Sequence, residues 1–141
     1  EQYGINPEGI VFEITESADI EHFNLISTVL MDLKAQGYRF SLDDFGTGYA
    51  SMTHFKRLPF SQVKIDQSFV ADIDSNEDSL AIAEVVLAMA RSLKLEVIAE
   101  GVETQAQLDI LTKLGCTGYQ GYLFSKPLSV QAVTSLLRAA T

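Results

Sequence analysis

Short apolar stretches alternate with longer stretches of helical periodicity along the chain. The predicted strands lie near residues 10–15, 38–43, 62–66, 95–100 and 118–122, and the predicted helices near residues 20–36, 50–57, 77–93, 104–114 and 129–140. Strands that alternate with helices form right-handed βαβ units, and such units build a parallel sheet. The pattern therefore predicts an α/β fold.

Helix-end signals support this phasing in the second half of the chain. Thr104 followed by Gln107 is typical of a capping box, in which the two residues satisfy each other's free backbone N–H groups. Gly115 stands where a helix C-terminus favours glycine. A helix is therefore expected to begin just after Thr104 and to end just before Gly115.

Polar side chains interrupt the predicted strands, each at or near the strand's C-terminal end. Strands of a parallel sheet are covered on both faces and usually read as continuous apolar runs, so these groups need an explanation. Because side chains alternate between faces, one face of each of the first three predicted strands grows polar toward the strand end, and Glu13, Asp43 and Lys64 lie on that face. Asp44 can reach the same site as Asp43 only where the strand bends into a loop. The groups are Glu13, Asp43 with Asp44, Lys64 with Asp66, Glu100 and Gln120.

The C-terminal ends of parallel strands hold the active site of a β/α barrel, or the ligand crevice of an open sheet. A complete eight-stranded barrel typically needs ~250 residues, and this chain has 141. Two architectures stay open: an open doubly wound sheet, or a TIM-like barrel present only as its later, roughly five strand–helix units. The chain begins at Glu1 without an initiator methionine, and on that ground we expect the second.

Composition narrows the class of partner. The net charge of −9 argues against direct electrostatic binding to a nucleic-acid polymer. It leaves room for a small phosphate ligand, since bound divalent cations reverse the local sign of charge. A single cysteine, Cys116, excludes an internal disulfide and suits a reducing compartment, so a cytoplasmic location is expected.

The pair Asp43–Asp44 is the sharpest chemical feature. It precedes a glycine-rich bend, and paired aspartates at a strand end suit two hard cations such as Mg²⁺ or Mn²⁺. The alternative is a turn in which the aspartates cap the backbone. Lys64 should be buried by its phase and should need an anionic partner, with a structural salt bridge to Asp43 or Asp66 as the simpler explanation. The set favours metal-assisted phosphoryl chemistry, and an enolase-like proton abstraction with Lys64 as base would use similar groups.

Five motifs in order resemble the EAL-domain cyclic-di-GMP phosphodiesterases. They are Phe12-Glu13-Ile14-Thr15-Glu16, Asp43-Asp44-Phe45-Gly46-Thr47-Gly48-Tyr49, Lys64-Ile65-Asp66, Ala99-Glu100-Gly101-Val102-Glu103 and Gln120-Gly121-Tyr122. The resemblance runs through essentially the whole chain. It implies a TIM-like barrel with one reversed strand and a metal-dependent hydrolysis of cyclic-di-GMP to linear pGpG.

The resemblance also implies a role for each matching residue. Metal ligands would be Glu13, Asp43, Asp44 and Glu100, and catalytic roles would fall to Lys64, Glu100 and Gln120. Glu16 would anchor the loop that follows the second strand, and Asp66 and Pro127 would bind substrate.

Two features of that family are absent: the Glu-Ala-Leu signature and an asparagine on the following strand. We therefore expect residues 1–141 to form a single partial EAL domain without its N-terminal strands, active in a longer parent but impaired alone. Sensory or GGDEF domains and a membrane tether in that parent are further expectations. The alternative function is a non-catalytic cyclic-di-GMP receptor or regulatory module. Unpaired strand edges also predict self-association, for example as a homodimer.

Overall fold

The computed structural model describes residues 4–15, 23–45 and 58–139. Two side chains within these ranges, those of Phe23 and Asp44, are left out of the description. The predicted helix over 50–57 and the predicted loop anchor Glu16 lie outside the described residues.

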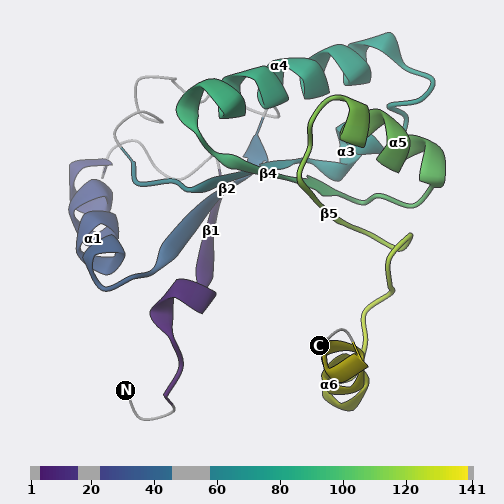
Figure 1. Ribbon diagram of the computed structural model, residues 1–141. Helices are drawn as coiled ribbons and strands as arrows, with labels where there is room; N and C mark the ends of the chain where they lie inside the picture. The colour runs from purple at the N-terminus through teal and green to yellow at the C-terminus, as the bar shows by residue number, and fades with distance from the viewer. Residues whose placement is uncertain (1–3, 16–22, 46–57, 140–141) are drawn as a thin grey trace.

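The core of the molecule is a parallel five-stranded sheet with strands in chain order (Figure 1). Every neighbouring pair of strands is parallel, which confirms the prediction made from alternation. Chain-order parallel strands joined by helices are the arrangement of a partial α/β barrel. The strands are β1 (Val11–Thr15), β2 (Arg39–Phe45), β3 (Gln62–Ile65), β4 (Glu96–Glu100) and β5 (Gly118–Gln120).

The described helices follow the prediction with two additions. The short elements η1 and α3 were not predicted, because a single turn carries no periodic apolar stripe. The helices are η1 (Pro7–Gly9), α1 (Phe23–Ala35), α3 (Gln67–Val70), α4 (Glu77–Leu93), α5 (Gln105–Lys113) and α6 (Val130–Ala139). The capping box of Thr104 and Gln107 is present, and Gly115 has the positive φ of a helix-terminating glycine.

The hydrophobic core lies between the sheet and its covering helices. Val63 and Ile65 of β3 are fully buried, and they belong to the same cluster as Leu87 and Ala90 of α4. Figure 1 shows α4 lying across one side of the sheet with α5 beside it. The central strands are therefore fixed by packing, and the position of their C-terminal ends is fixed with them.

Helix α6 stands apart from this core. It follows an extended segment after β5 and lies away from the other helices in Figure 1. None of its residues is buried, and Val130 and Leu137 are 79% and 64% exposed. Within the described residues, no helix is long and apolar enough to span a bilayer.

Candidate active site

Lys64 lies at the centre of a cluster of three carboxylates. Its ammonium nitrogen Nζ is 2.9 Å from Glu13 Oε1, 3.3 Å from Asp43 Oδ1 and 2.7 Å from Glu100 Oε1. The Lys64 side chain is only 7% exposed, while that of Glu13 is 53% exposed. The side chains of Asp43 and Glu100 are each 19% exposed, so the cluster has a buried cation, two largely buried carboxylates and one carboxylate, that of Glu13, open to solvent.

The register of the sheet explains why these residues meet. Thr15 of β1 is opposite Asp43 of β2, and Ile65 of β3 is opposite Ala99 of β4. Parallel strands in this register end at one edge of the sheet. Residues far apart in the sequence are therefore brought to a single point by backbone pairing alone.

The protonation of Lys64 follows from its neighbours. Burial alone would lower the pKa of this amine, but hydrogen bonds to Glu100 and Glu13, with the charges of Glu100 and Asp43, outweigh it. The pKa of Lys64 is therefore raised above its ordinary value. A lysine with a raised pKa is protonated at neutral pH and is a poor general base there, which argues against the enolase-like alternative.

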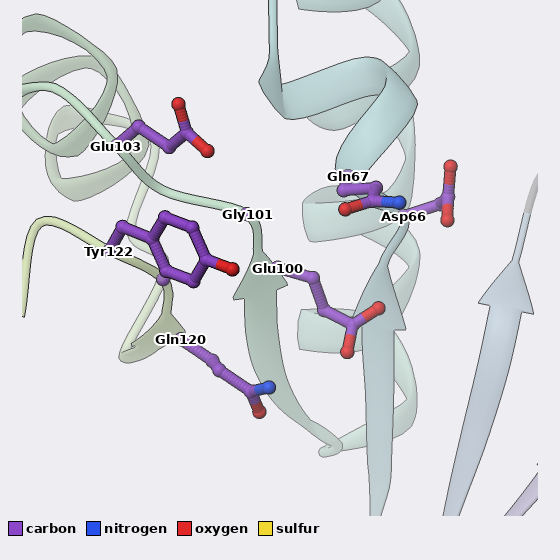
Figure 2. A pocket seen from close by; sticks show the side chains of 8 residues that line it. Asp66, Gln67, Glu100, Gly101, Glu103, Gln120 and Tyr122 are labelled. Carbon is purple, nitrogen blue, oxygen red and sulfur yellow. The ribbon is translucent and has the colours of Figure 1, made fainter. Parts of the chain in front are cut away.

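A pocket of about 440 Å³ adjoins the cluster (Figure 2). Glu100 belongs to both, because it pairs with Lys64 and also lines the pocket. The pocket walls come from the ends of β3, β4 and β5 and the turns after them. The lining residues are Asp66, Gln67, Glu100, Gly101, Glu103, Gln120, Gly121 and Tyr122.

Two glycines let the pocket walls approach each other. Gly101 has φ of +68°, and a Cβ built there would lie 2.7 Å from Gln67 Cβ. A Cβ on Gly121 would lie 2.1 Å from the backbone oxygen of Val102, a distance that real atoms do not adopt. The turn after β5 is also hydrogen-bonded to Val102, whose N–H donates to Gln120 and whose carbonyl accepts from Leu123. Both positions therefore require glycine.

The structure also locates the remaining predicted residues. Gln120 is exposed and lines the pocket, beside Glu100 in Figure 2. Asp66 lines the pocket too, but its Oδ1 accepts hydrogen bonds from the backbone N–H of Ser68, at 2.9 Å, and from the Ser68 hydroxyl. Asp66 is thus the N-cap of α3. Pro127 is not among the lining residues.

Gln67 and Tyr122 also line the pocket, and neither was predicted to have a role. Tyr122 stands within a motif that carries the family resemblance, which was the only available signal. No sequence signal indicated Gln67, since its position in the pocket wall depends on the short helix α3, which was not predicted.

The donor set suits a hard divalent cation, because carboxylate oxygens are the ligands that Mg²⁺ and Mn²⁺ prefer. Among the described residues, however, no three histidine, cysteine or acidic side chains are arranged to hold a metal ion. The carboxylates of Glu13, Asp43 and Glu100 are directed at the Lys64 ammonium instead.

Comparison with known proteins identifies the family to which this architecture belongs. The profile of the EAL domain matches residues 1–127. The chain belongs to the EAL domain family. The family resemblance predicted from the five motifs is thereby confirmed.

Two curated relatives come from Pseudomonas aeruginosa. This EAL chain is 42% identical over 99% of its length to the cyclic di-GMP phosphodiesterase NbdA, covering 18% of that protein. It is 39% identical over 92% of its length to the bifunctional diguanylate cyclase/cyclic di-GMP phosphodiesterase MucR, covering 19% of that protein. The chain thus spans about a fifth of the length of these relatives.

Solved structures agree with the fold. The EAL domain of Mycobacterium smegmatis DcpA superposes with a TM-score of 0.92 at 38% identity, over 98% of this chain and 62% of that one. A manganese/cyclic-di-GMP complex of Klebsiella pneumoniae BlrP1 superposes with a TM-score of 0.81 at 33% identity, over 89% of this chain and 32% of that one. The predicted EAL-type barrel architecture is confirmed by these neighbours.

Proposed function

We propose that the protein containing this EAL chain is a metal-dependent phosphodiesterase that hydrolyses one phosphodiester bond of cyclic-di-GMP to give linear pGpG. The observation that carries the proposal is the meeting of Glu13, Asp43 and Glu100 at one buried lysine, beside an open pocket. The names of the relatives NbdA and MucR support the substrate class.

The acidic groups of the cluster would hold the metal. Glu13, Asp43 and Glu100 supply oxygen donors at one sheet edge, and Asp44 is the fourth proposed ligand. Divalent cations, when bound, neutralise phosphate charge and make a water molecule a better nucleophile. The BlrP1 complex with manganese supports a divalent cation, while the choice between Mg²⁺ and Mn²⁺ stays a prediction.

The chain's other polar groups would bind and orient the reactants. The Lys64 ammonium is a fixed positive charge that would stabilise charge developing on the phosphoryl oxygens. The Gln120 amide, exposed at the pocket wall, would hold the attacking water by donating and accepting hydrogen bonds. The Tyr122 ring lines the same pocket, with the Lys126 ammonium nitrogen 5.5 Å from the ring centroid, and it would stack on a guanine base.

The test is hydrolysis of cyclic-di-GMP by the purified protein, followed by chromatography of the nucleotides. We expect pGpG to accumulate with Mg²⁺ or Mn²⁺ and to stop accumulating when EDTA is added. Tight binding of cyclic-di-GMP without any pGpG under both metals would overturn the proposal in favour of the receptor or regulatory module.

Other properties of the whole protein also stay proposals. We propose that the protein self-associates, for example as a homodimer, and that it is located in the cytoplasm. We also propose that it carries additional sensory or GGDEF domains. Glu16 keeps its predicted role as the anchor of the loop after the second strand. Asp66 and Pro127 keep their predicted roles in substrate binding. We also keep the proposal that residues 1–141 are a partial domain that is impaired when isolated.

A further inference from the structure

We propose that Lys64 is an internal counter-ion that competes with the divalent cation for the same carboxylates and thereby sets the metal affinity of the site. This inference rests on the metal site of the proposed function. It adds a role that Lys64 plays before any nucleotide is present.

The contacts of Lys64 carry the first step. A lysine ammonium has three N–H donors and no acceptor. Its nitrogen lies within 3.3 Å of one oxygen from each of Glu13, Asp43 and Glu100. The contacts of 2.7 Å with Glu100 and 2.9 Å with Glu13 are hydrogen bonds that occupy two of these donors, and the Asp43 carboxylate lies near the third at 3.3 Å. A water molecule or a phosphate would therefore compete with these carboxylates for the Lys64 donors.

The net charge of the cluster shows why a metal ion and the Lys64 ammonium would compete. Three carboxylates and one ammonium give the cluster a net charge of −2, which a single divalent cation would neutralise. That cation would have to approach the same oxygens as the ammonium, and two positive charges a few ångströms apart repel strongly at a partly buried site. Each metal ion bound is therefore opposed by the lysine.

Burial carries the third step. The Lys64 side chain is 7% exposed and extends from β3, which is buried among the core residues. Its ammonium has little freedom to swing into solvent and reduce the repulsion. The competing charge thus stays near the carboxylates when metal arrives.

The decisive experiment is a nucleotide-free titration of purified metal-free protein with Mn²⁺, read by electron paramagnetic resonance of the free ion. We expect K64M to bind Mn²⁺ about tenfold more tightly than the wild type, because a unit charge beside the site has been removed. The matched control is K113M, which deletes an exposed lysine on α5 and should leave the affinity unchanged. Equal or weaker binding by K64M would overturn the inference.

A second measurement separates competition from a purely structural ion pair. Without metal, K64M should melt at a lower temperature than the wild type, because three carboxylates are left facing one another. Added Mn²⁺ should then raise the melting temperature of K64M more than that of the wild type. A structural ion pair would give the first effect without the second. If K64M does not fold, K64Q replaces it in both measurements.

Two further variants locate the effect and keep it distinct from catalysis. K64R retains the positive charge and should bind Mn²⁺ no more tightly than the wild type. Adding E13Q to K64M should abolish the gain, since one of the competing carboxylates is lost. If the wild type hydrolyses cyclic-di-GMP but K64M shows no tighter binding, only this inference fails. If no variant binds Mn²⁺, the metal-dependent function fails as well.

Discussion

Glu100 Oε1 lies 2.7 Å from Lys64 Nζ, and the same glutamate lines the neighbouring pocket. One side chain therefore connects the charged cluster on the inner face of the strands with the space that would receive a ligand. A change at Glu100 should affect both the charge balance and the pocket wall.

We predict that Glu100→Gln lowers hydrolysis of cyclic-di-GMP by about 10²-fold or more, the scale on which removing one acid–base or electrostatic group acts. The amide keeps the shape of the side chain but loses its charge. The measurement is the rate of pGpG formation at saturating metal. Glu84→Gln, the same change on an exposed position of α4, is the control and should keep the wild-type rate.

Gln107 is a buried amide that supports the turn after β4. Its Oε1 accepts hydrogen bonds from the backbone N–H groups of Glu103, at 2.8 Å, and Thr104, at 2.9 Å, while its Nε2 donates to the carbonyl of Ala71. Gln107→Ala leaves these backbone groups without that partner, so we predict a loss of about 2–3 kcal/mol of unfolding free energy. Urea denaturation measures it.

The matched control is Gln105→Ala on the same helix. Gln105 is exposed, and its amide donates to Asp109, four residues away. Such a surface pair is worth about 0.2–0.5 kcal/mol. Equal losses for the two variants would contradict the role assigned to Gln107.

Asp72 stabilises the start of α4 in a pH-dependent way. Hydrogen bonds from the Ser79 hydroxyl, at 2.6 Å, and the Asn76 amide, at 2.8 Å, hold the pKa of Asp72 below its ordinary value. A carboxyl whose pKa is lower in the folded state stabilises the fold above its unfolded-state pKa of ~3.9, and loses this effect as the pH falls through the folded-state value.

We therefore predict that Asp72→Asn lowers the melting temperature at pH 7 and that the difference from the wild type shrinks below about pH 4. Thermal unfolding followed by circular dichroism across this range measures the difference. A gap that stays constant down to pH 2.5 would contradict the assignment. Asp109→Asn, at an exposed position of α5, should show a smaller gap throughout.

Ser41 is fully buried in β2, and its hydroxyl has no hydrogen-bond partner in the part of the chain that the structure describes. Removing a buried, unsatisfied polar group is close to neutral or stabilising. We predict that Ser41→Ala changes the unfolding free energy by less than about 0.5 kcal/mol or raises it. A loss of about 2 kcal/mol would show that the hydroxyl has a partner in the folded protein.

Much of the fold could be predicted from the sequence because it depends on local patterns. Alternation of short apolar runs with helical periodicity gave all five described strands, and capping residues gave the limits of α5. The single turn α3 could not be predicted in this way. Asp66, the N-cap of α3, was therefore interpreted as one more carboxylate at a strand end. Its capping role depends on a turn that is too short to give a periodic apolar pattern.

The candidate site was predicted less completely. The phase of β3 correctly indicated that Lys64 is buried and needs an anionic partner, and Asp43 is one of those partners. The contacts to Glu13 and Glu100 depend on the register between strands, which no local pattern encodes. The side chain of Asp44 lies outside the described residues, so its part in a metal site stays a prediction.

The tight contact between Gly121 and the backbone of Val102 also has a consequence for how this scaffold can diversify. Any larger residue at position 121 would push apart the two turns that bring Glu100 and Gln120 to the same pocket. Changes in ligand preference that spare these turns must then enter through side chains free to vary in size, such as Gln67 and Tyr122. Mutational libraries aimed at new nucleotide preferences should vary those two positions and keep Gly101 and Gly121 unchanged.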